Sequence, residues 1–317
     1  MNKQIATLPR HLKKDDKVNV LVLSAPDGFN FKNQFLNGVD CLKGYGLKVQ
    51  YSDECFASAG YTVSSPEKQA QALNNAFSDH SIKGIFLAGG GYNLNRVLPF
   101  IDFDLIKSNP KVIIGMSNMS VLLNAILAKT GLASYYGPAV IHNLGNPEGF
   151  DEYSKQSFRK TLFENSLIGE ITPFSKWKTL NSGIAEGKIV GGNLTSIESL
   201  IGTEYEPDWT ESILFWEDCF MELHTLDMIL THFMLAGIFT KIKGMVIGRP
   251  LEIQEEEMAC DLNFEDIITD ICGKLNIPVM YNVDFGHNDE KFTLPIGVEV
   301  TIDCDNTKIS LDRQHIK

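Results

Sequence analysis

The 317-residue sequence has no long apolar run and no excess of positive charge. No stretch approaches the roughly 18 apolar residues of a membrane-spanning helix, and the first residues lack the apolar core of a signal peptide. The sequence has 28 Lys and Arg residues against 40 Asp and Glu, so its net charge is −12. Because nucleic-acid binding needs clustered cations, this charge argues against a nucleic-acid partner. We therefore expect a cytoplasmic protein that binds neither membranes nor nucleic-acid polymers.

Cysteine is sparse, and no two cysteines form a CxxC pair. The six are Cys41, Cys55, Cys219, Cys260, Cys272 and Cys304. Without an export signal, scattered cysteines favour free thiols over a disulfide framework or a zinc site. The seven histidines are equally dispersed and show no HExxH spacing. The sequence thus predicts no metal site and no cofactor.

In other respects the composition is that of a folded globular protein, with 44% apolar and 21% charged residues. At about 150 residues per domain, the length predicts two domains. Over the first 150 residues, β-branched runs alternate with stretches of helical periodicity. The expected strands are 17–25, 47–52, 83–88 and 111–116, and the expected helices include 30–46 and 65–80. This alternation predicts an α/β fold, with a parallel sheet covered by helices.

The pattern changes after residue 150, where polar stretches without a clear period precede a second set of strands and helices. Residues 299–311 alternate apolar and polar residues around Asp305 and Asn306, which predicts an antiparallel hairpin. We expect a first domain at 1–165, a crossover linker at 166–182 and a mixed, β-rich second domain at 183–317.

Ser117 stands where the strand 111–116 gives way directly to a helical segment. A serine on such a turn lies above the carboxyl edge of the sheet, and the backbone N–H groups after it lie at a helix N-terminus. This arrangement suits a nucleophile whose developing negative charge must be stabilised. The simpler alternative is that Ser117 only caps the helix, since the sequence is not a complete GxSxG motif.

The glycines Gly89, Gly90 and Gly91 follow the strand 83–88. Glycines at a strand end allow backbone N–H groups to approach a phosphate or an oxyanion closely. Neither a GK[ST] nor a GxGxxG motif is present, which excludes the two common phosphate-binding fingerprints. A tight turn without a ligand remains the alternative.

A serine nucleophile needs a general base and a carboxylate that orients the base. His287 lies in a polar loop after Gly286, and Glu217 and Asp218 directly follow the apolar strand 212–216. Side chains at the carboxyl end of a strand face the crevice in which open α/β sheets bind ligands. These residues are therefore the candidates for the base and the acid.

Several motifs in order along the chain resemble those of the LD-carboxypeptidase family of serine peptidases. They are GGGYN, NPKVIIGMSN, TGLASYYGP, EGKIVGGNLTSIESLIGTEYEPD, ILFWED, KGMVIGRP and PVMYNVDFGHNDEKFTLPIG. The resemblance spans about residues 17–312. It implies a Rossmann-like N-terminal domain with a parallel sheet, a mixed, β-rich C-terminal domain, an active site in the cleft between them, and a homodimer.

The resemblance also implies roles for single residues. Ser117 matches the nucleophile, Glu217 the orienting acid and His287 the general base of a serine carboxypeptidase. The backbone N–H groups of Gly91 and Asn118 match an oxyanion hole. Asn118 replaces the family's usual Asp, so any charge that the Asp contributes is lost here.

The close approach of backbone to substrate in this family implies that Gly90 belongs to the binding site, together with Tyr92, Trp177 and Arg249 as further candidates. Trp177 would stack on a nucleobase, although a buried anchor for the crossover loop is the simpler interpretation. Arg249 would bind a substrate carboxylate, although a structural ion pair is the simpler interpretation.

Two substrate classes remain open within the family. One is a murein tetrapeptide that loses its terminal D-alanine during peptidoglycan recycling, and the other is a peptidyl or aminoacyl nucleotide, as in microcin C resistance. Outside this chemistry, the chain could be a catalytically weakened binding or regulatory protein on the same fold.

Overall fold

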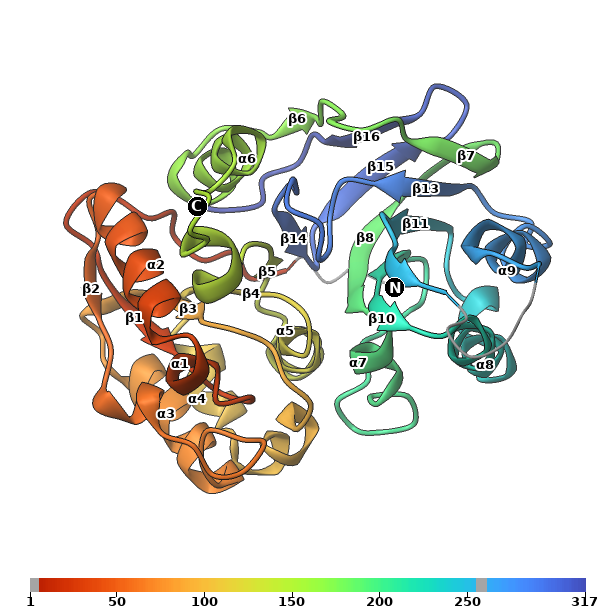
Figure 1. The fold of residues 1–317 in the computed structure, drawn as a ribbon. Coiled ribbons are helices and arrows are strands. Elements are labelled where there is room, and N and C mark those ends of the chain that lie inside the picture. The colour runs from red at the N-terminus through yellow and green to blue at the C-terminus, as the bar shows by residue number, and fades with distance from the viewer. Residues whose placement is uncertain (1–5, 255–260) are drawn as a thin grey trace.

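The structure is a computed structural model that describes residues 6–254 and 261–317. It contains two large β-sheets, one built mainly from the first half of the chain and one from the second half (Figure 1). Helices cover the sheets, because the apolar faces of a sheet must be shielded from water. The expected α/β class, with a parallel sheet followed by a mixed and strand-rich one, is confirmed.

The first sheet has six strands in the order β14-β5-β4-β3-β1-β2. Five of them are parallel and come from the first half: β1 (Lys17–Leu21), β2 (Lys48–Gln50), β3 (Ile82–Leu87), β4 (Val112–Gly115) and β5 (Ser134–Tyr136). The first four lie where the sequence predicts strands, and β5 was not predicted. The sixth, β14 (Leu294–Ile296), runs antiparallel beside β5. Because the five parallel strands share a direction, the turns that follow them meet at one edge of the sheet.

Helices connect these strands on both faces of the sheet. They are α1 (Asp27–Asn30), α2 (Lys32–Gly44), α3 (Pro66–Ser78), α4 (Phe103–Ser108), α5 (Met119–Thr130) and α6 (Glu152–Phe163). Short 3-10 segments at Asp53–Phe56, Leu94–Arg96 and Leu98–Phe100 and a π-helical turn at Val140–Leu144 complete this half. The predicted helix at 65–80 is α3, which starts with Pro66 after the extended Ser65.

The helix α5 lies between the two halves of the molecule (Figure 1). Its residues from Met119 to Ile126 are all buried, which is typical of a helix with protein on every side. The side chain of Asn124 donates a hydrogen bond of 2.8 Å to the carbonyl of Gly191 in the second half. The turn that precedes α5 is therefore fixed against both sheets.

The second sheet has eight strands in the order β6-β16-β15-β8-β9-β11-β13-β7. Its strands are β6 (Gly169–Glu170), β7 (Lys178–Asn181), β8 (Ile184–Asn193), β9 (Ile213–Glu217), β11 (Gly244–Gly248), β13 (Val279–Val283), β15 (Glu299–Asp303) and β16 (Lys308–Leu311). The central strands β8, β9, β11 and β13 are parallel, and the outer ones are antiparallel. β15 and β16 form the predicted hairpin around Asp305 and Asn306.

Three helices and a small ribbon complete the second half: α7 (Leu194–Glu198), α8 (Leu223–Leu235), α9 (Phe264–Ile271), a 3-10 segment at Ile238–Thr240, and the paired strands β10 (Cys219–Met221) and β12 (Leu251–Ile253). Within the described residues, no helix combines the length and apolar character needed to cross a membrane.

The chain crosses between the halves more than once. The segment 166–182, expected to be a linker, contributes β6 and β7 to the second sheet, while β14 returns to the first. Near the C-terminus, Ile316 is buried in the core of the first half. The domain boundaries at 165 and 183 stay a prediction.

Candidate active site

Ser117 lies on the turn between β4 and α5, as the sequence predicts. Its φ of 59° is in the left-handed region, which is strained for a residue with a side chain and is often found at functional sites. Within the described residues, neither Ser117 nor Asn118 caps α5 through its side chain. The Ser117 hydroxyl is therefore not used as a helix cap, which was the simpler interpretation.

The glycine turn after β3 lies directly against Ser117. A Cβ at Gly90 would be only 2.9 Å from Ser117 Oγ, so this close approach requires glycine. The next residue, Gly91, has a φ of 139°, and a Cβ there would be 2.2 Å from Ser24 Oγ. The hydroxyl oxygen of Ser24 in turn accepts hydrogen bonds from the backbone N–H of Tyr92 and of Asn93. These contacts fix the turn beside the serine.

Two backbone donors next to Ser117 have no acceptor among the described residues. In the part of the chain that the structure describes, neither the N–H of Gly91 nor that of Asn118 forms a hydrogen bond. Unpaired N–H groups of this kind are a recurrent device for holding a developing oxyanion. Their position agrees with the site that the resemblance implies.

The buried side chain of Asn118 connects this turn to its surroundings. Its Oδ1 accepts hydrogen bonds from the N–H of Leu94 (3.1 Å) and from the hydroxyl of Ser24 (3.2 Å). Its Nδ2 donates to Ser196 Oγ (3.5 Å) in the second half. A carboxylate could accept the first two bonds but could not donate the third. The Asn in place of the family's Asp is therefore used for positioning, and its neutral amide fits the contacts present.

Glu217, at the end of β9, is almost completely buried. Its Oε1 accepts a hydrogen bond of 2.6 Å from the hydroxyl of Tyr136 and one of 3.4 Å from Nδ2 of Asn193, and its Oε2 lies 2.7 Å from Nδ1 of His287. Burial alone would raise the pKa of this carboxyl, but the charge of His287 and these hydrogen bonds outweigh it, so the pKa is lowered. The carboxylate is thus stabilised in its ionised form.

His287 lies in the loop after β13, and its nitrogen Nδ1 is the one that faces Glu217. Burial would lower its pKa, but the Glu217 charge and hydrogen bonds to Glu217 and the Cys219 thiol raise it to about 10. Gly286 (φ 107°) allows the loop to pass over the carboxylate, since a Cβ there would be 2.6 Å from Glu217 Oε2.

Tyr136 joins the two halves of the site. The backbone N–H of Ser117 donates to its hydroxyl oxygen (3.2 Å), and that hydroxyl donates to Glu217. A continuous path of hydrogen bonds thus runs from Ser117 through Tyr136 and Glu217 to His287. The path joins the backbone of Ser117 to the pair of Glu217 and His287, and Tyr136 is a member that sequence reasoning missed. A signal was available, because Tyr136 ends the strand beside the one that leads to Ser117.

Asp218, the residue after Glu217, accepts hydrogen bonds from its own surroundings and, among the described residues, forms none with His287. Its carboxylate accepts hydrogen bonds from Asn193, from the N–H of Cys219, and from both the N–H and the hydroxyl of Thr195 at the start of α7. Burial and the nearby charge of Glu217 raise its pKa. Asp218 fixes α7 and Asn193 beside the site.

Two residues considered as substrate contacts have partners within the protein. The indole N–H of Trp177, which is 5% exposed, donates to Asp284 (2.7 Å). Arg249 lies 3.4 Å from Asp284 and 3.2 Å from Glu290, and donates to the carbonyl of Glu290. These contacts hold the ends of the loop that carries His287, which agrees with the simpler, structural interpretation of both residues. Tyr92, by contrast, is 84% exposed beside Gly91.

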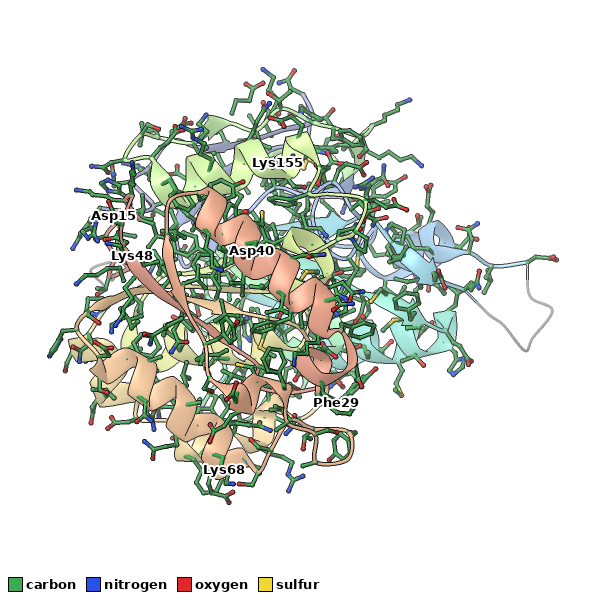
Figure 2. All side chains as sticks on the ribbon, turned by 60° about the vertical axis from the view of Figure 1, so that its left-hand side comes forward. Asp15, Phe29, Asp40, Lys48, Lys68 and Lys155 are labelled. Atoms are coloured by element: carbon green, nitrogen blue, oxygen red, sulfur yellow. The ribbon has the colours of Figure 1, made fainter. Side chains whose placement is uncertain are left out.

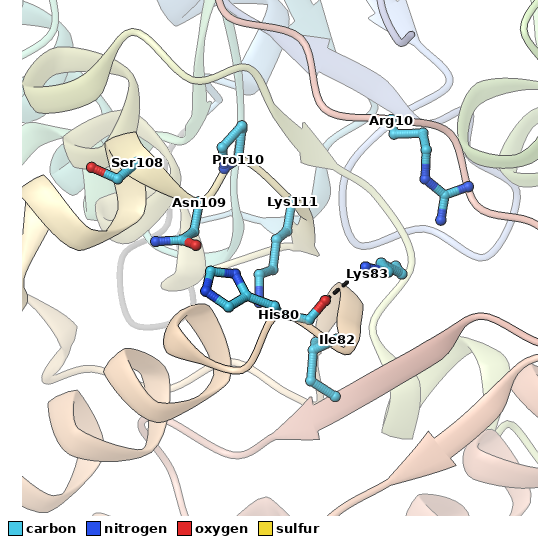
Figure 3. Close-up of a pocket in the computed structure, with 8 residues that line it drawn as sticks. All are labelled: Arg10, His80, Ile82, Lys83, Ser108, Asn109, Pro110 and Lys111. Carbon is cyan, nitrogen blue, oxygen red and sulfur yellow. Dashed lines mark hydrogen bonds between the residues drawn. The ribbon is translucent and has the colours of Figure 1, made fainter.

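A separate basic cavity of about 280 Å³ lies at the opposite edge of the first sheet, where β3 and β4 begin (Figure 3). Its cationic groups already have partners in the protein. Lys111 donates to the carbonyls of Ala76 and Asp79, Lys83 to that of His80, and Arg10 to Asp16. This cavity is remote from Ser117. Within the described residues, no three His, Cys, Asp or Glu side chains are grouped so as to hold a metal ion.

Comparison with known proteins agrees with this geometry. The family model of the LD-carboxypeptidase N-terminal domain matches residues 18–137, and that of the LD-carboxypeptidase C-terminal domain matches residues 186–302. The microcin C7 self-immunity protein MccF of Escherichia coli is 30% identical, over 95% of this chain and 94% of that protein. A probable murein peptide carboxypeptidase of Bacillus subtilis is 28% identical, over 93% and 91%.

Solved structures show the same relationship. The apo structure of MccF superposes with a TM-score of 0.91 at 30% identity, covering 98% of this chain and all of that one. A muramoyltetrapeptide carboxypeptidase from Oxalobacter formigenes shares the fold, with a TM-score of 0.80 at 23% identity over 93% and 97%.

The fold and these relatives therefore define a serine-type carboxypeptidase, which is a hydrolase. More particularly, the chain belongs to the LD-carboxypeptidase family, whose two domain models together cover most of its length.

Proposed function

We propose that this protein hydrolyses an amide bond through an acyl-enzyme, with Ser117 as nucleophile, His287 as general base and Glu217 as the acid that orients the imidazole. The observation that carries the proposal is the hydrogen-bonded path from Ser117 through Tyr136 and Glu217 to His287. Because Glu217 engages Nδ1, we assign the proton exchange with the serine to the other ring nitrogen, Nε2.

In the proposed reaction, His287 takes the hydroxyl proton of Ser117 as Oγ attacks the substrate carbonyl carbon. The carbonyl oxygen becomes negatively charged and accepts hydrogen bonds from the free N–H groups of Gly91 and Asn118. The imidazolium then gives its proton to the leaving amine, and water repeats the sequence to release the acid.

The first candidate substrate is a short peptide that ends in D-alanine, such as a murein tetrapeptide. The Bacillus subtilis relative carries the name of a murein peptide carboxypeptidase. The burial of Trp177 also favours a peptide, because an indole enclosed by protein offers no free face to a nucleobase.

The second candidate is an aminoacyl or peptidyl nucleotide. Structures of MccF with glutamyl sulfamoyl guanosine and with aspartyl sulfamoyl adenosine support it, because both superpose on this chain with a TM-score of 0.91. The cytoplasmic location and the homodimer stay predictions.

The test is to incubate the protein separately with a murein tetrapeptide and with aspartyl sulfamoyl adenosine, and to identify the released amine by mass spectrometry. Release of D-alanine supports the first candidate, and release of the sulfamoyl nucleoside supports the second. A fluorophosphonate probe should label the protein at Ser117 and should not label Ser117→Ala. Binding without hydrolysis or labelling would instead support the weakened binding protein considered from the sequence.

A further inference from the structure

Residues 312–317 cross from the second sheet to the first half of the molecule. They follow β16, which belongs to the second sheet, yet Ile316 is buried in the core of the first half. At Lys317 the backbone N–H donates to the carbonyl of Pro9 (2.8 Å), and the carbonyl accepts the N–H of His11 (2.7 Å). Figure 1 shows this segment reaching α6. We call residues 312–317 the strap, because they tie the two halves together.

His315 is the titratable residue of the strap whose side chain lies in the interior. Its Nε2 lies 3.0 Å from the carbonyl oxygen of Thr161 on α6. Its own carbonyl accepts a hydrogen bond of 3.0 Å from the hydroxyl of Tyr135 on β5. Because a carbonyl oxygen only accepts, Nε2 must carry a hydrogen. The docked ring is therefore a donor at Nε2.

The strap meets α6 on the side of the helix that faces the protein. Phe158, Thr161 and Leu162 on that side are buried. On the other side the Lys155 side chain is 44% exposed, and Figure 2 shows it at the surface together with Asp40 of α2. The His315 ring, which has no exposed surface, is thus enclosed by the first half and shielded from bulk water.

A positive charge on this enclosed ring would be uncompensated. The second ring nitrogen, Nδ1, is buried without a hydrogen-bond partner among the described residues, so a proton there would have no acceptor. The titratable groups on the surrounding elements are the phenol of Tyr135, the ammonium of Lys160 and the imidazole of His11, and none of them is a carboxylate. Burial lowers the pKa of His315 from 6.5, the hydrogen bond to Thr161 offsets only part of this, and the charge of Lys160 lowers it further.

We propose that the strap is a pH-sensitive latch, which docks while His315 is neutral and is released when the ring binds a second proton. The strand β5 connects this latch to the active site. Tyr135 and Tyr136 are neighbours on β5, and neighbouring side chains of a strand point to opposite faces. One of them holds the strap and the other holds Glu217. Release therefore removes a hydrogen bond from the strand that carries Tyr136, whatever reaction the site performs.

The size of the effect follows from the behaviour of a free histidine. A histidine in water has a pKa of about 6.5, so at pH 5 about 30 protonated rings are present for each neutral one. Below pH 6.5 the released strap thus binds more protons than the docked strap, and docking weakens as the pH falls. Because the docked form excludes the second proton, the equilibrium constant for release should rise by up to about 30-fold from pH 7.5 to pH 5.

The test is amide hydrogen exchange of the whole protein at pH 7.5 and pH 5, followed by mass spectrometry and corrected for the intrinsic pH dependence of exchange. Peptides that cover the strap and His11 should lose about 10- to 30-fold of their protection at pH 5, whereas the central strands of both sheets keep theirs. His315→Gln can still donate to the carbonyl of Thr161 but cannot be protonated, so its loss should stay below about threefold. His80→Gln, which changes an exposed histidine on the same half, is the matched control and should behave like the parent.

Equal losses of protection in the parent and in His315→Gln would overturn the latch. A loss shared equally by the strap and the central strands would also overturn it, because the whole fold would then be opening. If His315→Gln does not fold, deuterium exchange at the imidazole C2 position of the parent gives the titration midpoint of His315 itself. A midpoint well below pH 6.5 supports the latch, and a midpoint at or above pH 6.5 contradicts it.

Discussion

The two halves of the molecule contribute to the active site in different ways. The first half supplies backbone: a strained turn at Ser117, a glycine turn against it, and the N–H groups of Gly91 and Asn118, which have no acceptor among the described residues. The second half supplies buried charge, the pair of Glu217 and His287, which contacts between distant segments hold in place. The difference shows that one site can combine two kinds of feature. The backbone turns are encoded by a few neighbouring residues, whereas the buried charged pair forms only after distant segments have folded together.

The largest effect on activity should come from removing the proposed nucleophile, which the first half contributes. Ser117→Ala should lower kcat by roughly a million-fold, as for other serine nucleophiles, because no other group attacks the carbonyl. The free energy of unfolding should change by less than about 1 kcal/mol, because the hydroxyl does not cap α5. Steady-state kinetics and urea unfolding measure the two. Cleavage at the parent rate would contradict the assignment of Ser117.

The contribution of the second half is tested by Glu217→Gln, which keeps the shape and removes the charge. We expect kcat to fall by roughly ten-thousand-fold, because the imidazole loses its orientation. In the parent, Glu217 raises the pKa of His287 to about 10, so kcat/KM should increase with pH well above 6.5 as the base loses its proton. Without the charge, that increase should move to lower pH. Profiles measured from pH 5 to 10.5 that coincide would contradict this role of Glu217.

The contribution of the first half is tested by Gly90→Ala. The added Cβ would lie 2.9 Å from Ser117 Oγ, so the serine or the glycine turn must move, and kcat should fall about 100- to 1000-fold. Gly44→Ala is the matched control, because a Cβ at the end of α2 meets nothing within 4 Å. Similar kinetics for both variants would show that the close approach is unimportant.

The smallest expected effect is on stability, and it concerns Lys291, a buried charge that interacts with Glu217. Lys291 is 2% exposed, and its Nζ has no hydrogen-bond partner among the described residues. Burial lowers its pKa from 10.5 to about 8, despite the attraction of Asp289, Glu217 and Asp151. This shift corresponds to roughly 3 kcal/mol of destabilisation when the amine is protonated.

Between pH 8 and 10.5 the folded protein binds fewer protons at Lys291 than the unfolded chain does, so this penalty is complete below about pH 8 and disappears as the pH rises. Lys291→Met should therefore raise the free energy of unfolding by about 1–3 kcal/mol at pH 7, and by less at pH 10. Urea unfolding at the two pH values measures this. A loss of stability at pH 7 would show that the ammonium group is better satisfied than its contacts indicate.

Sequence reasoning was most successful where the signal is local. The β-branched runs located β1, β3 and β4, and Ser65 with Pro66 located the start of α3, because strand and helix preferences act over a few residues. It was least successful where a role depends on partners. Tyr136 received no role, and the partners that engage Arg249 and Trp177, Asp284 and Glu290, could not be named.

The sequence by itself determined the alternation of strands and helices, the serine turn and the glycine turn, because each is encoded by neighbouring residues. The tertiary structure alone decided which acid faces His287 and that Tyr136 connects that acid to Ser117. These depend on which side chains meet after folding and on how far each is buried, and burial sets both the charge state of a group and its need for hydrogen bonds.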